Sequence, residues 1–303
     1  MRLGVSGMRR RVGPLALAIC ALAAPASAQE LVRRIGSVTF RVDVSQAFPG
    51  GVVVVRLASR GRLGAAWALL DGRRAPFYSD RKGPRALVPV ATSAEPGPAT
   101  LGVGVAAHGG EQRIAIPIKL GARDYPARHV DLNDAQRALA DGDEARRDAR
   151  RLLAQLRTES KTPSPERFQP PVAGVGSGFG EPRSYTGIAD AESRTDALFG
   201  EQHRGLDYRV QADTPVRAPA GGNVLFAGTL RLAGGTVVID HGQGVVSVLH
   251  HLASVTVHEG DSVAAAAVVG RSGQTGIAPE PMLEWRVYLH AVAVDPLVLG
   301  PLL

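Results

Sequence analysis

Two short stretches carry side chains that could bind a metal ion or move protons. In the first, His203-Arg-Gly-Leu-Asp207, an imidazole and a carboxylate lie four residues apart, just before an apolar run that starts at Val216. The second, Met282-Leu-Glu-Trp285, lies far downstream. Neutral imidazole and carboxylate are usual nitrogen and oxygen ligands of zinc. One such pair proves little by itself, because most His/Asp pairs at this spacing share no function.

The first 28 residues have the pattern of a secretory signal peptide. Arg2 and the run Arg9 to Arg11 precede an apolar segment, Val12 to Ala24, which is followed by Ala26-Ser27-Ala28. A basic segment, a short apolar core and an A-x-A site together predict cleavage after Ala28. The apolar segment is too short to remain as a membrane span. We therefore expect a secreted protein with no stable membrane insertion after signal cleavage.

Composition favours a globular protein with two modest domains. The chain has 303 residues, of which 45% are hydrophobic and 21% are charged. Removal of residues 1–28 takes away four arginines and no acid, which leaves 31 basic and 28 acidic residues and a net charge of +3. The same cleavage removes Cys20, the single cysteine. The mature protein must rely on its hydrophobic cores, with or without a bound metal, rather than on disulfides.

Residues 30–120 alternate between apolar and polar side chains and contain frequent turn signals, such as Asp71-Gly72 and Gly109-Gly110. Short strands at this spacing predict an immunoglobulin-like β-sandwich. This segment holds 13 Lys/Arg and 6 Asp/Glu. Adhesion to an anionic polymer such as cell wall is one interpretation of that surplus. An ordinary arginine-rich surface is the other, and the scattered placement of the charges favours it.

Residues 121–170 predict a helical spacer followed by a Pro-rich linker. Asn133 can cap a helix from Asp134 to about Arg157, with acids early and arginines late. Opposite charges interleave along this helix and no aromatic residue is available to stack on bases, so nucleic-acid binding is poorly supported. We expect a solvated spacer. Thr162-Pro-Ser-Pro165 and Pro170-Pro171 then end it.

Residues 171–303 are rich in predicted strands and contain no helix of ordinary length. Thr236 to Asp240 and Val245 to His251 predict a hairpin around His241-Gly-Gln-Gly244. Further strands follow, including Met282 to Leu289. A compact antiparallel sheet with long loops is expected here.

Several short motifs occur in order in this last region: Gly205-Leu-Asp207, Thr214-Pro-Val-Arg-Ala-Pro-Ala220, Val237-Val-Ile-Asp-His-Gly242, His251-Leu252, Val257-x-x-Gly-Asp-x-Val263, Gly273-x-Thr-Gly276 and Val294-Asp-Pro296. Together they resemble the lysostaphin/LytM-type family of zinc metallopeptidases, which cut peptide cross-links of bacterial peptidoglycan. The resemblance covers residues 176–299. It implies a mainly β protein with a peptidase domain at residues 171–303. The preceding regions are similar to the amino-terminal half of exported, Gram-negative-type members, which makes the periplasm the expected location.

The resemblance assigns roles to individual residues. The family's zinc ligands are the His and Asp of H-x-x-x-D and the second His of a late H-x-H. The first two fall on His203 and Asp207. A further histidine, in a Y-x-H-L segment, acts on the zinc-bound water, and it falls on His251. The late motif departs from the family, because Met282 stands at the first histidine and Glu284 at the third ligand.

These two replacements differ in their chemistry. Glu284 can still ligate zinc, although a second carboxylate makes the site more anionic and less strongly Lewis acidic. Met282 can neither accept nor donate a proton at neutral pH, and the loss of one positioned acid/base group typically costs about 10²–10⁴ in rate. His250 should point away from His251, since strand side chains alternate.

Two hypotheses follow. In the first, the protein is a peptidoglycan metalloendopeptidase with a modified zinc site of His203, Asp207 and Glu284, and His251 is its remaining general base. In the second, it is a catalytically inactive binding protein that regulates another cell-wall hydrolase. Survival of both early ligands motivates the first, and Met282 motivates the second.

Overall fold

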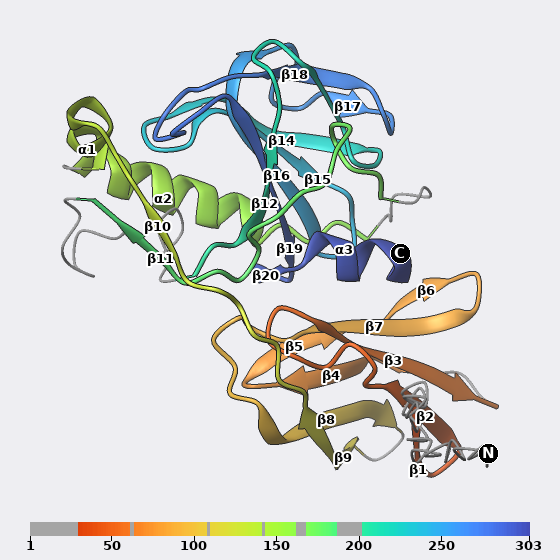
Figure 1. The fold of residues 1–303 in the computed structure, drawn as a ribbon. Helices are drawn as coiled ribbons and strands as arrows, with labels where there is room; N and C mark the ends of the chain where they lie inside the picture. Colours follow the sequence, from red (N-terminus) through yellow and green to blue (C-terminus); the bar gives the residue numbers. More distant parts are fainter. Residues whose placement is uncertain (1–29, 61–63, 108–109, 141–142, 162–167, 187–201) are drawn as a thin grey trace, which may run out of the picture.

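The computed structural model describes residues 30–60, 64–107, 110–140, 143–161, 168–186 and 202–303. The predicted signal peptide and the first linker prolines, Pro163 and Pro165, lie outside these residues. An amino-terminal β-sandwich, a pair of helices and a carboxy-terminal sheet follow one another along the chain (Figure 1). Among the described helices, none combines the length and the apolar character that a membrane crossing requires.

The amino-terminal part is a sandwich of two antiparallel sheets, in the strand orders β1-β2-β3-β7-β6 and β5-β4-β8-β9. Side chains from both sheets share one apolar core, including Phe40 and Val55 from the first sheet and Leu101 and Ile116 from the second. The predicted β-sandwich is thus confirmed as an architecture. Its strands are β1 (Glu30–Ile35), β2 (Val38–Asp43), β3 (Val52–Ser59), β4 (Ala66–Leu70), β5 (Arg73–Pro76), β6 (Tyr78–Asp80), β7 (Gly83–Pro89), β8 (Gly97–Ala107) and β9 (Gly110–Leu120).

Two helices, α1 (Asp134–Ala140) and α2 (Asp143–Leu156), occupy the predicted helical segment. Asn133 caps α1, since its Oδ1 accepts a hydrogen bond of 2.9 Å from the N–H of Gln136. The description of this segment as solvated is wrong for α2. Its apolar residues recur every three or four positions and form a buried stripe against the carboxy-terminal sheet. The stripe consists of Ala145, Ala149, Leu152 and Leu156.

The carboxy-terminal part is an antiparallel sheet with the strand order β12-β19-β16-β15-β14-β17, to which β13, β18 and β20 add at its margins. The predicted hairpin is confirmed as β15 and β16, and the helical content described here is limited to α3 (Pro296–Leu299) and a 3₁₀ turn, Gly300–Leu302. The strands are β12 (Gly205–Arg209), β13 (Pro215–Arg217), β14 (Gly222–Leu230), β15 (Gly234–Asp240), β16 (Val245–Val255), β17 (Ser262–Val263), β18 (Val268–Ser272), β19 (Met282–Leu289) and β20 (Val292–Val294).

Strand β19 lies inside this sheet and is buried along its whole length. Because strand side chains alternate, Leu283 and Trp285 enter the apolar core on one face. Met282, Glu284 and Arg286 face the opposite side, where a cleft lies. A single strand therefore supplies both core packing and three side chains of the site.

A two-stranded parallel ribbon stands beside the sheet and consists of β10 (Arg128–Val130) and β11 (Arg183–Tyr185). The segment that leads into β10 is fixed against both halves of the molecule. Tyr125 Oη donates to the carbonyl of Pro49 at 2.6 Å, and Arg123 forms an ion pair of 2.7 Å with Asp295. The sandwich thus holds the start of the ribbon in place.

Candidate functional site

Three adjacent strands bring the predicted site residues together. β19 pairs with β12 on one side and with β16 on the other, so that Glu284 lies opposite Asp207 in one ladder and opposite His250 in the other. His203 precedes β12, and backbone hydrogen bonds to residues 180–181 fix its position. Strand register therefore brings His203 and Glu284, which are 81 residues apart in the chain, into direct contact.

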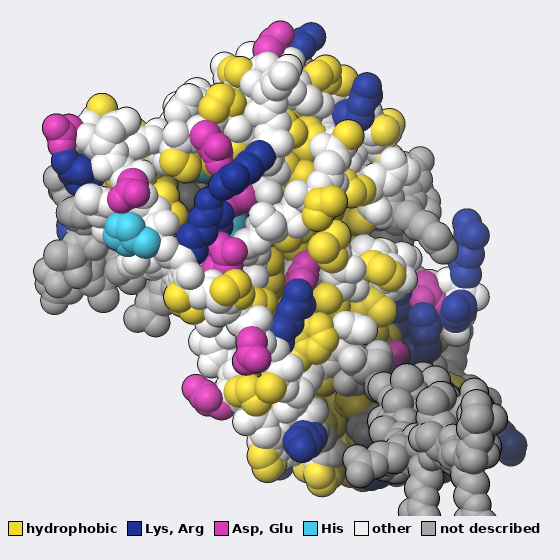
Figure 2. Space-filling view, viewed as in Figure 1, with side chains coloured by type: hydrophobic (Ala, Val, Ile, Leu, Met, Phe, Trp, Pro, Cys, Tyr) yellow, Lys and Arg dark blue, Asp and Glu magenta, His cyan; other side chains and the backbone are white. Residues whose placement is uncertain are grey.

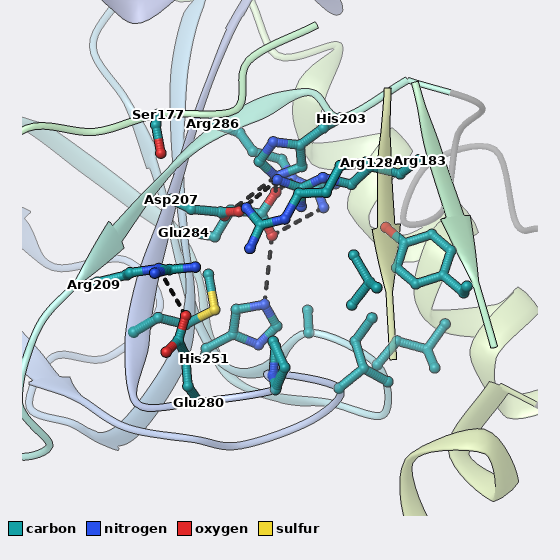
Figure 3. Close-up of a pocket in the computed structure, with 17 residues that line it drawn as sticks. Arg128, Ser177, Arg183, His203, Asp207, Arg209, His251, Glu280, Glu284 and Arg286 are labelled. Carbon is teal, nitrogen blue, oxygen red and sulfur yellow. Dashed lines mark hydrogen bonds and ion pairs between the residues drawn. The ribbon is translucent and has the colours of Figure 1, made fainter. Parts of the chain in front are cut away.

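His203, Asp207 and Glu284 form one compact, buried group. His203 Nε2 lies 2.7 Å from Glu284 Oε1 and 3.3 Å from Asp207 Oδ1. The exposed fractions of the three residues are 5%, 8% and 4%. Nδ1 of His203 lies 2.8 Å from the carbonyl oxygen of Gly178, so this nitrogen donates and Nε2 faces the carboxylates. The group converges on one side of the cleft, with His251 across from it (Figure 3).

Two arginines that sequence reasoning missed hold the carboxylates. Arg286 Nε lies 2.6 Å from Glu284 Oε1 and its Nη2 lies 3.1 Å from Oε2, a two-point contact. Arg183 Nη2 lies 2.6 Å from Asp207 Oδ2. The position of Arg286, two residues after Glu284 on a strand, places both side chains on one face and was a usable signal. Arg183 comes from β11 and has no comparable signal.

The charges in this group are balanced in pairs. Burial alone would raise the pKa of Glu284, but the charges of Arg286 and His203 outweigh it and hold this pKa well below its ordinary value. Burial is outweighed in the same way at Asp207, whose pKa is lowered by His203 and Arg183. Burial also lowers the pKa of His203, but the two carboxylates raise it further, so the net shift is upward. Both carboxylates are ionised at neutral pH, each beside a guanidinium.

His251 faces the cleft from an irregular point of β16. Its φ is +66°, a conformation that side-chain-bearing residues rarely adopt and that costs on the order of 1–3 kcal/mol. The ladder to β15 shifts register nearby, between Gly235 and Val237. Nδ1 of His251 lies 2.9 Å from the carbonyl oxygen of Thr275, and Nε2 lies 3.5 Å from Glu284 Oε2. The ring therefore donates from Nδ1 and presents Nε2 to the cleft.

His250 is buried and does not line the cleft, but it lies opposite Glu284 in the β16–β19 ladder and therefore on the same face of the sheet, so the expectation that it points to the opposite face is wrong. Its Nδ1 lies 3.0 Å from Thr236 Oγ1 and its side chain has no exposure. Burial, together with the nearby charge of Arg286, lowers the pKa of His250 well below its ordinary value. His250 is thus a neutral residue of the sheet interior.

The cavity at the centre of this cleft has a volume of about 50 Å³. Apolar side chains of Val130, Leu232, Ile277 and Met282 form part of its lining, and four arginines form another part: Arg128, Arg183, Arg209 and Arg286. A band of Lys/Arg side chains lies across this face, with acidic side chains beside it (Figure 2). The β10–β11 ribbon supplies one wall (Figure 3).

Comparison with known proteins identifies the carboxy-terminal sheet. Residues 201–296 match the model of Peptidase family M23. These residues, which we call the M23 domain, are similar to that family. The predicted family resemblance is thereby confirmed. A crystal structure from Pseudomonas aeruginosa, assigned to peptidase M23, is 29% identical, has a TM-score of 0.60, and covers 85% of this chain and 96% of its own. That likeness extends beyond the M23 domain to the sandwich.

Curated relatives match about a third of the chain. The Neisseria meningitidis serogroup B protein named DD-carboxypeptidase/endopeptidase Mpg is 35% identical over 94 residues, which are 31% of this chain and 22% of that protein. The Vibrio cholerae protein named Peptidoglycan DD-endopeptidase ShyA is 30% identical over 93 residues, which are 31% of this chain and 22% of that protein. The chain thus spans less than a quarter of these two relatives.

The M23 domain departs from the family pattern at the cleft face of β19. Met282 lines the cleft beside Glu284, where the resemblance predicts a proton-transferring histidine. Leu249, which replaces the tyrosine of the Y-x-H-L segment, is fully buried in the core on the other face. Glu280 forms an ion pair of 2.8 Å with Arg209 at the rim of the cleft. The replacements therefore differ in their effect on the site, because Met282 lines the cleft whereas Leu249 lies in the core on the other face of the sheet.

The donor types of this group and their convergence suit the zinc ion that the family implies. One ligand atom from each of His203, Asp207 and Glu284 lies within 4.8 Å of the other two, so the group could hold a metal ion. Asp207 Oδ1 has no hydrogen-bond partner among the described residues. The contact between His203 Nδ1 and a backbone carbonyl is also one that metal-ligating histidines usually make.

One distance and the arginine contacts do not suit zinc. Two ligands that each lie about 2.0–2.1 Å from a tetrahedral zinc lie about 3.3 Å apart, whereas His203 Nε2 and Glu284 Oε1 are 2.7 Å apart, a hydrogen-bond distance. A divalent ion would also have to compete with Arg183 and Arg286, which already contact the carboxylates of Asp207 and Glu284. In this arrangement the site does not fit a resident zinc ion, and the zinc site stays a prediction from the family.

Proposed function

We propose that this protein binds cross-link peptides of peptidoglycan in the cleft of its M23 domain and does not hydrolyse them. One observation carries the proposal: Arg286 contacts both oxygens of Glu284, and His203 bonds to the same carboxylate. The residue at the third ligand position is thereby saturated by groups of this chain. Met282 supports the same conclusion, because a thioether cannot take over the proton transfer of an imidazole.

The proposed substrate class rests on the family and on the shape of the site. The relative from Vibrio cholerae is named a peptidoglycan DD-endopeptidase, and it is 30% identical to this chain over 93 residues. Apolar side chains such as Val130, Leu232 and Ile277 offer contacts to the small aliphatic side chains of such peptides. His251 and the buried ion pairs provide the polar groups that would orient a bound backbone.

Export and control of a second enzyme belong to the same proposal. The basic and apolar pattern of residues 1–28 supports transfer to the periplasm, where peptidoglycan lies. A protein that binds the cell wall without cutting it can position or restrain another cell-wall hydrolase there. We therefore propose such a hydrolase as its partner.

The test measures metal content, wall binding and wall cleavage on one preparation of the purified protein. We expect sedimentation with purified peptidoglycan, no stoichiometric zinc after dialysis against zinc, and no release of new peptide ends. His203→Ala should also leave the cell phenotype unchanged relative to the wild type. Failure to sediment with peptidoglycan would contradict the binding function itself.

A metalloendopeptidase is the second candidate, and one observation favours it. The three potential ligands converge within 4.8 Å, and His251 presents Nε2 toward them across the cleft. This candidate predicts stoichiometric zinc and chelator-sensitive release of peptide ends from the same preparation. Such a result would replace the proposal of non-hydrolytic binding.

A further inference from the structure

We infer that the cleft recognises a free carboxylate on its peptide ligand and that Arg128 is the side chain that binds it. This inference rests on the proposed function and names the ligand group that the cleft selects. Arg128 is partly exposed and lines the cleft. Within the described part of the chain, its guanidinium has neither a hydrogen bond nor an ion pair.

The other arginines of the cleft already have acidic partners. Arg183 contacts Asp207, Arg286 contacts Glu284, and Arg209 contacts Glu280 at 2.8 Å. Arg183 also contacts Glu181, which does not line the cleft. Among the arginines and acids that line the cleft, the three pairs cancel in formal charge, and Arg128 is the arginine without an acidic partner. A cleft with an uncompensated guanidinium favours an anionic ligand. A carboxylate suits it best, because a guanidinium can bind both carboxylate oxygens at once.

The backbone of Arg128 is held in place before a ligand arrives. Its N–H donates to the carbonyl of Pro182 at 2.8 Å, and in the parallel β10–β11 ribbon it lies in register with Arg183. Arg128 and Arg183 extend from the ribbon toward the same side of the cleft (Figure 3). A fixed backbone reduces the ordering cost of binding. Arg128 also lies outside residues 201–296, so the charge is added to the M23 domain by a preceding segment.

Apolar groups lie beside this cation in the lining of the cleft. Val130 comes from the same strand as Arg128, and Leu232 and Ile277 come from loops of the sheet. A carboxylate next to a small aliphatic side chain matches both features. A peptide that ends in alanine has a free carboxylate next to a methyl side chain. Uncross-linked peptidoglycan stem peptides end in this way.

The test uses two synthetic stem-type peptides, one ending in D-alanyl-D-alanine and the other ending in the corresponding amide. Titration calorimetry on the purified full chain should show about tenfold tighter binding of the free acid, the effect of one charge-assisted hydrogen bond. Arg128→Ala should reduce binding of the acid to the level of the amide. Arg113→Ala removes the same charge from an exposed site on β9 and should leave the preference intact.

Each outcome bears on a different statement. Equal binding of acid and amide by the wild type overturns the carboxylate inference and leaves the proposed function standing. A preference that persists in Arg128→Ala also overturns it, because another group then reads the carboxylate. Binding of neither peptide also overturns this inference, whereas the proposed function is overturned by failure to sediment with peptidoglycan. Unchanged melting temperatures of the variants would show that both remain folded.

Discussion

On one face of β19, Leu283 and Trp285 pack into an apolar core, whereas on the other face Glu284 and Arg286 line the cleft. All four side chains are nearly inaccessible to water. The apolar face gains free energy from burial itself. On the cleft face the charged groups lose the free energy of hydration, and close ion pairs offset this loss. The stability of each buried charge therefore depends on its partner. Glu284 and Arg286 are therefore one unit, and the change from a ligand histidine to glutamate has to be considered together with the arginine.

Two histidines show the same contrast. His203 lies on the cleft side beside two carboxylates, and its pKa is raised although burial opposes this. His241 packs edge-on against Phe168, whose ring stacks on Trp285, and burial lowers its pKa to about 4. Both are buried, with exposed fractions of 5% and 3%. The two rings are similarly buried, so neighbouring charge, rather than burial, decides whether the pKa of each imidazole is raised or lowered.

The largest expected effect breaks the ion pair on the cleft face. Arg286→Met leaves Glu284 without its guanidinium and should lower the free energy of unfolding by about 3–5 kcal/mol. Urea unfolding at pH 7 measures it. Leu283→Ala, on the apolar face of the same strand, should cost about 2–5 kcal/mol through the cavity it leaves.

A double variant separates the two faces. Glu284→Leu with Arg286→Met removes both charges together. It should restore most of the free energy of unfolding that Arg286→Met loses, because no unpaired charge of this pair is then left buried. No second change on the apolar face offers such a rescue of Leu283→Ala. A cost below about 1 kcal/mol for Arg286→Met, the value of an exposed pair, would show that the cleft face is not dependent on pairing.

The next effect concerns pH. His241 has a folded-state pKa of about 4, below the ordinary value of about 6.5, so the unfolded chain binds this proton first as pH falls. Stability from His241 is present above pH 6.5 and is lost toward pH 4, by about 3 kcal/mol. His241→Gln should therefore flatten the pH dependence of urea unfolding between pH 7 and 4. His258→Gln, at an exposed side chain, serves as the control, and equal slopes in both variants would contradict the assignment.

The smallest effect concerns zinc. Met282→His with Glu284→His supplies the family's late histidines but removes the carboxylate that Arg286 contacts in the cleft. We expect zinc to stabilise this double variant little. Adding Arg286→Gln should permit binding, with about 2.7 kcal/mol of stabilisation at zinc concentrations about 100 times the dissociation constant. Thermal melting with and without zinc checks this, and equal zinc responses of the double and triple variants would show that Arg286 does not oppose the metal.

Much of the architecture could be predicted from local patterns. Alternation gave the strands of the sandwich and the β15–β16 hairpin, and motif order located His203, Asp207 and Glu284 in one site. The prediction that α2 is solvated was wrong. Its apolar stripe, from Ala145 to Leu156, contains few large residues and is interrupted by arginines, so the sequence pattern is weak. Arg183 was missed because its partner, Asp207, is 24 residues away in the chain and no sequence pattern connects them.

By itself the sequence determined the strands, the family and the three residues that converge, since periodicity and motif spacing are short-range properties of the chain. Only the tertiary structure decided what surrounds those residues. The register of β19 against β12 and β16 sets which charges meet, and the β10–β11 ribbon brings Arg128 into the cleft from a segment before the M23 domain. Ion pairs depend on distances of a few ångströms between strands that are remote in sequence, so their partners emerge only when the sheet is assembled.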